Sequence, residues 1–325
     1  MRPIIRACAA LAALALTATL AACGGERGTG DDGLYKRGRL AIATGNTTGV
    51  YYQLGGGLAD LISRRLPGYQ ATAEATGASV ENIQRVVRGD SDIAFSLADV
   101  AGDAATGKHD FTSPQPIRAL ARIYDNYVHV IARADAGIRS VADMKGKRIS
   151  TGSPKSGTET MALRLLEAAG IDPGSGVKKQ ALSLPETVQA MKDGTLDAMV
   201  WSGGLPTSGI TDLMTGLKDK AVFVPLDREL AALRSRYGPI YQQTTIGKDV
   251  YGTKGDVSTI AVPNVLVVSD KMPDALAHDL AKVIFENQQE LAKVHPEAKN
   301  IDRARAPQSE PVVVHPGAKR YYDGG

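Results

Sequence analysis

Cysteine is nearly missing from this sequence: its 325 residues include only Cys8 and Cys23, both near the N-terminus. No thiol is left elsewhere for a disulfide, a thiol nucleophile or a cysteine metal site. Histidine is also sparse, and its five copies are scattered without the His-x-x-x-His spacing of a metal site. We therefore expect neither thiol chemistry nor a bound metal.

Catalytic and nucleotide-binding motifs are missing too. Residues 152–157, GSPKSG, do not have the Gly-x-Ser-x-Gly order of a hydrolase nucleophile elbow. The Gly-rich region 44–57 has neither the Gly-Lys-Ser/Thr ending of a Walker loop nor the G-x-G-x-x-G register of a dinucleotide loop. No Lys/Arg cluster indicates a nucleic-acid partner. We expect a chain that is not an enzyme, needs no cofactor and binds no nucleic acid.

Long apolar runs are confined to the N-terminus. Residues 1–22 have a basic start, a short apolar run and small residues before Cys23, which is the order of parts in a secretory signal. The run is too short to span a bilayer comfortably. A cysteine directly after Leu-Ala-Ala resembles a bacterial lipoprotein signal, so we expect 1–22 to be removed and Cys23 to be lipidated. An ordinary secreted protein with a chance cysteine is the alternative.

Residues 23–38 follow this signal and are rich in glycine and charge, which is typical of a flexible tether. The signal carries Arg2 and Arg6, so little of the chain's net charge of +3 belongs to the remainder. We expect an extracytoplasmic protein that is held at the outer face of the cell membrane by its lipid.

Short apolar strands alternate with amphipathic helices along the rest of the chain. The predicted strands cover 40–43, 69–75, 92–95, two runs within 117–132, and 148–150, and the predicted helices cover 50–65, 79–89 with Ser79 as N-cap, and 156–169. Ser156 and Glu159 have the spacing of a capping box. This alternation favours an α/β fold with parallel sheets covered on both faces.

One short segment occurs twice. Residues 88–95 and 193–200 both place Gly-x-x-Asp between an amphipathic helix and an apolar strand. Any α/β turn favours glycine and aspartate, which would explain the repetition equally well. Two similar lobes are the other interpretation, and it is the one we adopt.

Three loops between strand ends and helix starts form the candidate site: 44–52, 76–82 and 152–159. Ligands bind at the carboxyl ends of parallel strands, where the free N–H groups of helix starts hold carboxylates or phosphates. Caps and turns would produce the same composition, and the single tryptophan fits either a site or the core. The candidate ligand-binding residues are Asn46, Thr47, Tyr51, Tyr52, Thr76, Ser79, Asn82, Ser153, Ser156, Gly157, Thr158 and Trp201.

Several motifs occur in order over residues 39–322: Ala43-Thr44-Gly45, Gly49-Val50-Tyr51-Tyr52, 76–82 (TGASVEN), Asp99-Val100-Ala101, 144–149 (MKGKRI), 156–159 (SGTE) and 315–322 (HPGAKRYY). Together they resemble the TAXI family of solute receptors of TRAP transporters. The resemblance implies a two-lobed type II periplasmic-binding-protein fold, each lobe a mainly parallel sheet flanked by helices. It also implies closure around a small organic acid or an amino acid such as glutamate, and delivery to integral membrane TRAP subunits driven by an ion gradient. We expect such a receptor to be a monomer.

On this resemblance, lobe one should comprise 39–126 and 262–325, and lobe two should comprise 127–261, joined by crossing strands at 124–132 and 258–268. Two departures bear on the ligand. Leu97 stands where the family often has glutamine, and Lys155 stands where glycine is common, which would suit a more anionic ligand. Two alternatives stay open: a ligand-sensing receptor for a signalling partner, and an ABC-type binding protein of the nitrate, sulfonate or thiamine-precursor kind.

Overall fold

The computed structural model describes residues 38–324. The expected signal segment and Cys23 lie outside the described residues, and of the expected tether only Gly38 is described. The carbonyl of Gly38 accepts a hydrogen bond from the Gln70 N–H at 2.9 Å. Among the described residues, no helix combines the length and the apolar character needed to cross a membrane.

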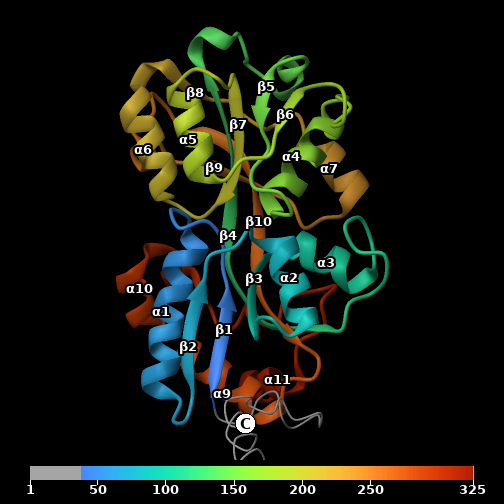
Figure 1. Ribbon diagram of the computed structural model, residues 1–325, viewed down its shortest axis with the longest axis vertical. Coiled ribbons are helices and arrows are strands. Elements are labelled where there is room, and N and C mark those ends of the chain that lie inside the picture. Colours follow the sequence, from blue (N-terminus) through green and yellow to red (C-terminus); the bar gives the residue numbers. More distant parts are fainter. Residues whose placement is uncertain (1–37, 325) are drawn as a thin grey trace, which may run out of the picture. The chain divides into compact units, whose positions relative to one another are not determined.

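The described part of the chain has two lobes, one above the other in Figure 1. Lobe one contains β1 (Arg39–Ala43), α1 (Val50–Arg65), β2 (Gln70–Glu74), α2 (Ser79–Arg88), β3 (Ile93–Leu97), α3 (Ala98–Thr106), α9 (Asp274–Glu286), α10 (Gln288–Val294) and α11 (Pro316–Tyr322). Lobe two contains β5 (Arg148–Ser150), α4 (Gly157–Ala168), β6 (Lys178–Gln180), α5 (Leu184–Lys192), β7 (Ala198–Gly203), α6 (Ser208–Leu217), β8 (Ala221–Phe223), α7 (Leu230–Tyr237), β9 (Gln242–Ile246) and α8 (Lys248–Tyr251). Short 3₁₀ segments are η1 (Ala134–Ala136), η2 (Val141–Met144), η3 (Lys218–Lys220) and η4 (Pro296–Asn300).

Two long strands, β4 (Ile117–Arg133) and β10 (Val257–Ser269), run through both lobes. The strand order is β2-β1-β3-β10-β4-β7-β5-β6, with β8 beside β4 and β9 beside β10. Within each lobe three strands are parallel: β1 with β2 and β3, and β5 with β6 and β7. The crossing strands are antiparallel to each other and to their neighbours. One hydrogen-bonded path therefore passes through both lobes, and the expected lobe boundaries fall inside these shared strands.

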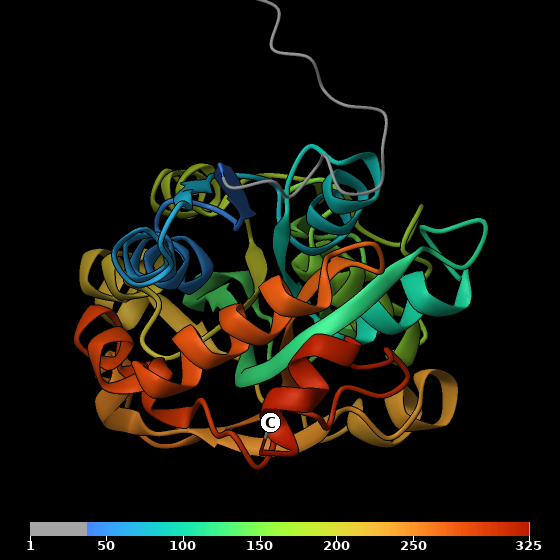
Figure 2. The same ribbon diagram turned by 90° about the horizontal axis from the view of Figure 1, so that it is seen from below.

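Most elements follow from the apolar pattern. Helix α1 has the predicted bounds and buries Val50, Leu54, Leu58 and Ile62 on one face. The predicted pair of runs over 117–132 is instead the single strand β4, because its middle residues are buried between the two lobes and stay paired with β10. On the far side of lobe one, α9 and α11 pack against each other beside β4 (Figure 2).

The predicted caps are only partly right. Ser156 caps α4, accepting a hydrogen bond from the Glu159 N–H at 2.9 Å, but the Glu159 carboxylate accepts from the Lys155 N–H and not from Ser156. Ser79 is not an N-cap: Ala78 precedes α2, and the Ser79 hydroxyl accepts from the Leu97 N–H at 3.0 Å. Ser79 therefore ties α2 to the end of β3.

The repeated Gly-x-x-Asp segment has the same geometry in both lobes. Asp92 Oδ2 accepts from the Ala41 N–H at 2.7 Å, and Asp197 Oδ2 accepts from the Arg148 N–H at 2.8 Å. Gly89 and Gly194 both adopt positive φ, 76° and 74°, at the ends of the preceding helices. Each aspartate thus anchors the start of one parallel strand to its neighbour, which supports the interpretation of two similar lobes.

Candidate ligand-binding site

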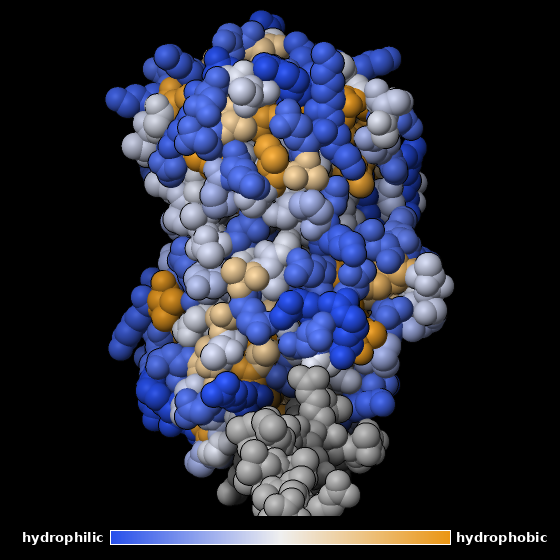
Figure 3. All heavy atoms as spheres, viewed as in Figure 1, coloured by the Kyte–Doolittle hydropathy of each residue, from blue (hydrophilic) through white to orange (hydrophobic). Residues whose placement is uncertain are grey.

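A cavity lies between the two lobes, where the strand ends of both meet. Its wall includes Asn46 after β1, Leu97 at the end of β3, Ser153 after β5 and Ser202 near the end of β7. Its volume is about 30 Å³, room for only one or two water molecules, so in this closed arrangement the protein's own side chains nearly fill the site. Figure 3 shows that the surface narrows at the junction of the lobes, where many residues of intermediate hydropathy lie.

Many of the expected site residues surround this cavity. The lining includes Asn46, Tyr51, Ser79, Ser153, Ser156, Gly157, Thr158 and Trp201. Thr47, Tyr52, Thr76 and Asn82 are not part of it. Thr47 is exposed and Tyr52 is half-buried on α1.

Asn82 is buried beneath the site and is occupied by the protein itself. Its amide Nδ2 donates to the carbonyls of Thr44 at 2.6 Å and Phe95 at 2.8 Å. Its Oδ1 accepts from the Thr76 hydroxyl at 2.6 Å. Asn82 and Thr76 therefore hold the loops that follow β1 and β2, instead of presenting hydrogen bonds to the cavity.

Asn46 joins the two lobes directly. Its Oδ1 accepts from the Leu184 N–H at 2.6 Å, and its Nδ2 donates to Ser153 Oγ at 3.2 Å. A second cross-lobe bond runs from the Glu81 N–H to the Lys155 carbonyl at 3.1 Å. The structure therefore has the lobes in contact along the cleft, in a closed arrangement. Lys155 adopts φ 58°, a conformation that favours glycine.

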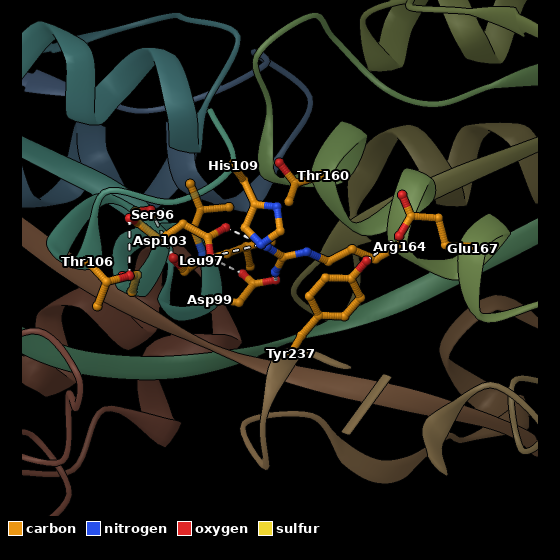
Figure 4. Close-up of polar contacts among 12 residues, drawn as sticks. Ser96, Leu97, Asp99, Asp103, Thr106, His109, Thr160, Arg164, Glu167 and Tyr237 are labelled. Atoms are coloured by element: carbon orange, nitrogen blue, oxygen red, sulfur yellow. Dashed lines mark hydrogen bonds and ion pairs between the residues drawn. The ribbon is translucent and has the colours of Figure 1, made fainter. Parts of the chain in front are cut away.

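A buried cation also spans the lobes (Figure 4). Arg164 of α4 donates from Nη1 to Asp99 Oδ2 of α3 at 2.9 Å and to the Tyr241 hydroxyl at 2.7 Å, and Nη2 binds Asp103. The Tyr237 ring centre lies 4.4 Å from the guanidinium carbon. Burial alone would lower the pKa of Arg164, but Asp99, Tyr241 and Asp103 raise it overall, so the guanidinium remains charged.

Three helices begin at the cavity wall. Val50 and Tyr51 of α1, Ser79 of α2, and Gly157 and Thr158 of α4 all line it. The first N–H groups of a helix have no partner within the helix, and together they act as roughly half a positive charge. Among the described residues that line the cavity there is no Asp, Glu, Lys, Arg or His. Partial positive charge at the wall therefore comes from the backbone, and Glu81 and Glu159 offset part of it in the first turns of α2 and α4.

Two buried hydroxyls in the wall have no hydrogen-bond partner among the described residues: Tyr124 OH and Ser202 Oγ. Their residues are 1% and 6% exposed. A buried polar group without a partner costs about 1–3 kcal/mol, a penalty that a water molecule or a bound ligand would remove. Burial raises the pKa of Tyr124, so its hydroxyl stays protonated and can donate.

Sequence reasoning did not find Tyr124 or Ser202, since they lie inside the buried strands β4 and β7 and look like core residues. Tyr51 was expected to offer a polar tip, but its hydroxyl donates to Asn264 Oδ1 at 2.5 Å, so only its ring faces the cavity. Trp201 is both a site residue and a core residue, because its ring lines the cavity and also packs in the core cluster of lobe two. Its Nε1 donates to Thr207 Oγ1 at 3.2 Å.

No group of three or more His, Cys, Asp or Glu side chains among the described residues could hold a metal ion.

The sequence matches the NMT1-like family over residues 42–324. Among solved structures, MatC from Rhodopseudomonas palustris with bound malate aligns with a TM-score of 0.56 at 11% identity, covering 89% of this chain and 99% of that protein. A binding protein component of an ABC phosphonate transporter from Pseudomonas aeruginosa aligns with a TM-score of 0.55 at 15% identity, covering 82% and 80%. An ancestral arginine-binding protein bound to arginine gives 0.50 at 14% identity, covering 80% and 98%. The two-lobed periplasmic-binding-protein fold is confirmed.

Proposed function

The chain belongs to the NMT1-like family, and from that premise we propose that it is an extracytoplasmic solute receptor. It captures a small carboxylate between its two lobes and delivers this ligand to a membrane transporter. The similarity to MatC, whose structure has bound malate, supports a ligand of this size and charge.

One observation carries the proposal: three helix starts converge on a closed cavity whose described lining has no ionised side chain and includes Tyr124 and Ser202, each with an unpartnered hydroxyl. Helix N-termini bind carboxylates and phosphates through free N–H groups. The cavity wall comes from both lobes, so the full set of contacts exists only when the lobes are closed. A ligand therefore shifts an open–closed equilibrium toward the closed arrangement.

We propose a TRAP permease as the membrane partner, because the motifs that resemble TAXI receptors occur in order along the chain. An ABC permease is the second candidate, favoured by the fold shared with the binding protein component of a phosphonate transporter. Uptake of labelled ligand by cells distinguishes them. Collapse of the ion gradient should stop TRAP uptake while ATP is present, whereas ATP depletion at a maintained gradient should stop ABC uptake.

We also propose that Cys23 carries a lipid that holds the receptor at the outer face of the cell membrane. The proposal rests on the Leu-Ala-Ala-Cys order of residues 20–23. Cells that express the protein should incorporate a labelled fatty acid into it, and the Cys23→Ser variant should incorporate none. Equal labelling of the two proteins contradicts the anchor.

A thermal-shift screen tests the binding function. A ligand that binds only the folded state raises the free energy of unfolding, by about 2.7 kcal/mol at one hundred times its Kd. We expect small carboxylates to raise the Tm of the wild type, and calorimetry should give one site per chain. If no small anion changes the Tm, the receptor function is contradicted.

A further inference from the structure

Resting on the proposed function, we infer that the captured carboxylate carries no protonated amine: it is a hydroxy acid or an oxo acid and not an amino acid. The sequence alone left organic acids and amino acids equally open. The arrangement of charges around the cavity separates these two classes.

The first argument is the lack of a counter-charge. No described carboxylate lines the cavity. A buried ammonium without a negative partner is strongly unfavourable, because the charge loses its hydration and gains no equivalent attraction. An amino acid enclosed here would have its carboxylate matched by the helix starts and its ammonium unmatched.

Three carboxylates close to the wall are already occupied. The Glu81 carboxylate accepts from the Gly77 N–H at 2.7 Å. The Asp99 carboxylate accepts from Arg164 at 2.9 Å, from the Tyr241 hydroxyl and from the Val100 N–H, both at 2.8 Å. The Glu297 carboxylate, beside Tyr124, accepts from the Leu205 N–H and from the Asn300 amide. None of the three can turn toward an ammonium without breaking these bonds.

The second argument is the sign of the backbone potential. Each helix with residues in the wall presents its first turn to the cavity: α1, α2 and α4. The start of α1 has no acidic residue in its first turn, so its partial charge of roughly +0.5 attracts an anion and repels an ammonium, whereas Glu81 and Glu159 offset part of the charge at the starts of α2 and α4. The potential that stabilises the carboxylate thus opposes the amine.

The third argument concerns the groups that face the rest of the ligand. Tyr124 OH and Ser202 Oγ are neutral and lack partners. A hydroxyl both donates and accepts, so the two suit an alcohol, a ketone or a second carboxylate oxygen. They could accept from an ammonium, but neutral oxygens do not cancel its charge.

Matched pairs of acids that differ only at C2 test this inference on the purified full chain. Suitable pairs are L-malate with L-aspartate, 2-oxoglutarate with L-glutamate, and pyruvate with L-alanine, extended to longer and branched skeletons. By calorimetry we expect the hydroxy or oxo acid of any pair that binds to have a Kd at least tenfold lower than its amino partner. An amino acid that binds as tightly as its oxo or hydroxy partner, or more tightly, overturns the inference and leaves the receptor function standing. If no member of any pair binds, and no other small anion does, both are overturned.

A charge placed in the wall gives a second readout. Ser202→Asp adds a carboxylate at the cavity, and Ser202→Asn adds a neutral side chain of the same size. We expect the Asp variant to weaken binding of the preferred acid at least tenfold more than the Asn variant does. We also expect a smaller ratio between the Kd of the amino acid and the Kd of its hydroxy or oxo partner in the Asp variant. Equal effects of Asp and Asn would show that charge does not select the ligand, and would overturn the inference.

Discussion

Arg164 in α4 and Asp99 in α3 form an ion pair across the cleft, with Nη1 2.9 Å from Oδ2 and side chains that are only 5% and 2% exposed. One partner belongs to each lobe, so the pair is buried only while the lobes are closed. A buried ion pair adds little net stability, but leaving one of its charges without the other is unfavourable by about 3–5 kcal/mol. The pair can therefore form only when the two lobes are correctly aligned, and so it specifies the closed arrangement.

Arg164→Met should shift the protein toward the open arrangement. The variant leaves Asp99 buried without its cation, and separation of the lobes lets water reach that carboxylate. We expect ligand affinity to fall at least tenfold and small-angle scattering to give a larger radius of gyration with ligand present. The double variant Arg164→Met/Asp99→Asn should recover part of the affinity, since it removes one of the two carboxylates, Asp99 and Asp103, that lose their cation. An unchanged radius of gyration together with a lower Tm would instead mean that the lobes do not separate when the pair is removed.

Gly157→Ala should block closure while sparing the fold. A Cβ at this position would lie 2.6 Å from Ser79 Oγ and 2.7 Å from Leu97 Cδ1, both in lobe one. We expect calorimetry to show at least tenfold weaker ligand binding and the Tm of the ligand-free protein to be nearly unchanged. Gly56→Ala is the matched control, because a Cβ there meets nothing within 4 Å. Its affinity should equal that of the wild type, and its helix should gain up to about 1 kcal/mol.

Tyr124→Phe and Ser202→Ala should weaken binding without destabilising the empty protein. Each removes a hydroxyl that has no partner among the described residues, so no internal hydrogen bond is lost on folding. A ligand would lose one bond, worth about 1–3 kcal/mol. Calorimetry and urea unfolding of both variants measure the two effects separately. Unaltered affinity in both would mean that these hydroxyls do not face the ligand.

Asn82→Ala should show the opposite pattern. The substitution leaves the buried carbonyls of Thr44 and Phe95 without their donor. We expect the free energy of unfolding to fall by about 2 kcal/mol or more, while the folded fraction binds ligand with nearly normal affinity. A normal Tm with lost affinity would mean that Asn82 contacts the ligand after all.

Stability should fall as the pH drops from 6.5 toward 4. Burial lowers the pKa of His129 from its ordinary 6.5 to about 4. The Tyr127 carbonyl can only accept, so Nδ1 holds the proton and Nε2 accepts from the Tyr251 hydroxyl at 3.1 Å. Between these two pH values the unfolded chain binds a proton that the folded chain does not. The contribution of His129 to the free energy of unfolding therefore has its full value well above pH 6.5. It decreases by about 3 kcal/mol as the pH falls to 4.

Urea unfolding at a series of pH values checks this prediction. His129→Gln should flatten the dependence on pH, and the difference between the two proteins isolates this histidine from other groups. Parallel curves for wild type and variant would contradict a neutral, buried His129. At pH 7 the ring is neutral in the folded protein, so ligand binding there should be unaffected by its titration.

Local chemistry explains which parts of the fold were predictable. The apolar spacing from Val50 to Ile62 defines α1, and Gly89 ends α2 with positive φ, so both bounds could be read from residue types. The loops that follow β1 and β5 were identified by their small polar residues, and the cavity lies beside them. These features depend on neighbours within a few positions in the chain.

Long-range pairing explains what was missed. Tyr124 and Ser202 sit on buried strands, and only the crossing of β4 between the lobes decides that their hydroxyls reach a cavity. Asn82 has the residue type of a ligand contact, but its partners lie just after β1 and on β3, which no local pattern places beside it. The sequence alone indicates an ordinary surface arginine at Arg164, because its partner Asp99 lies on α3, which only the closed fold brings against α4.

The place of β10 in the sheet has a consequence for how the chain is made. It lies between β3 and β4, pairing with both, although lobe two separates it from them in the sequence. A nascent chain thus cannot complete the sheet of lobe one until translation has passed Ser269. Helices α9 and α11, which also belong to lobe one, are made later still. Contacts so distant in sequence form slowly. With this order of strands lobe one cannot finish folding until late in synthesis, and an incompletely folded chain is one that a secretion channel can thread.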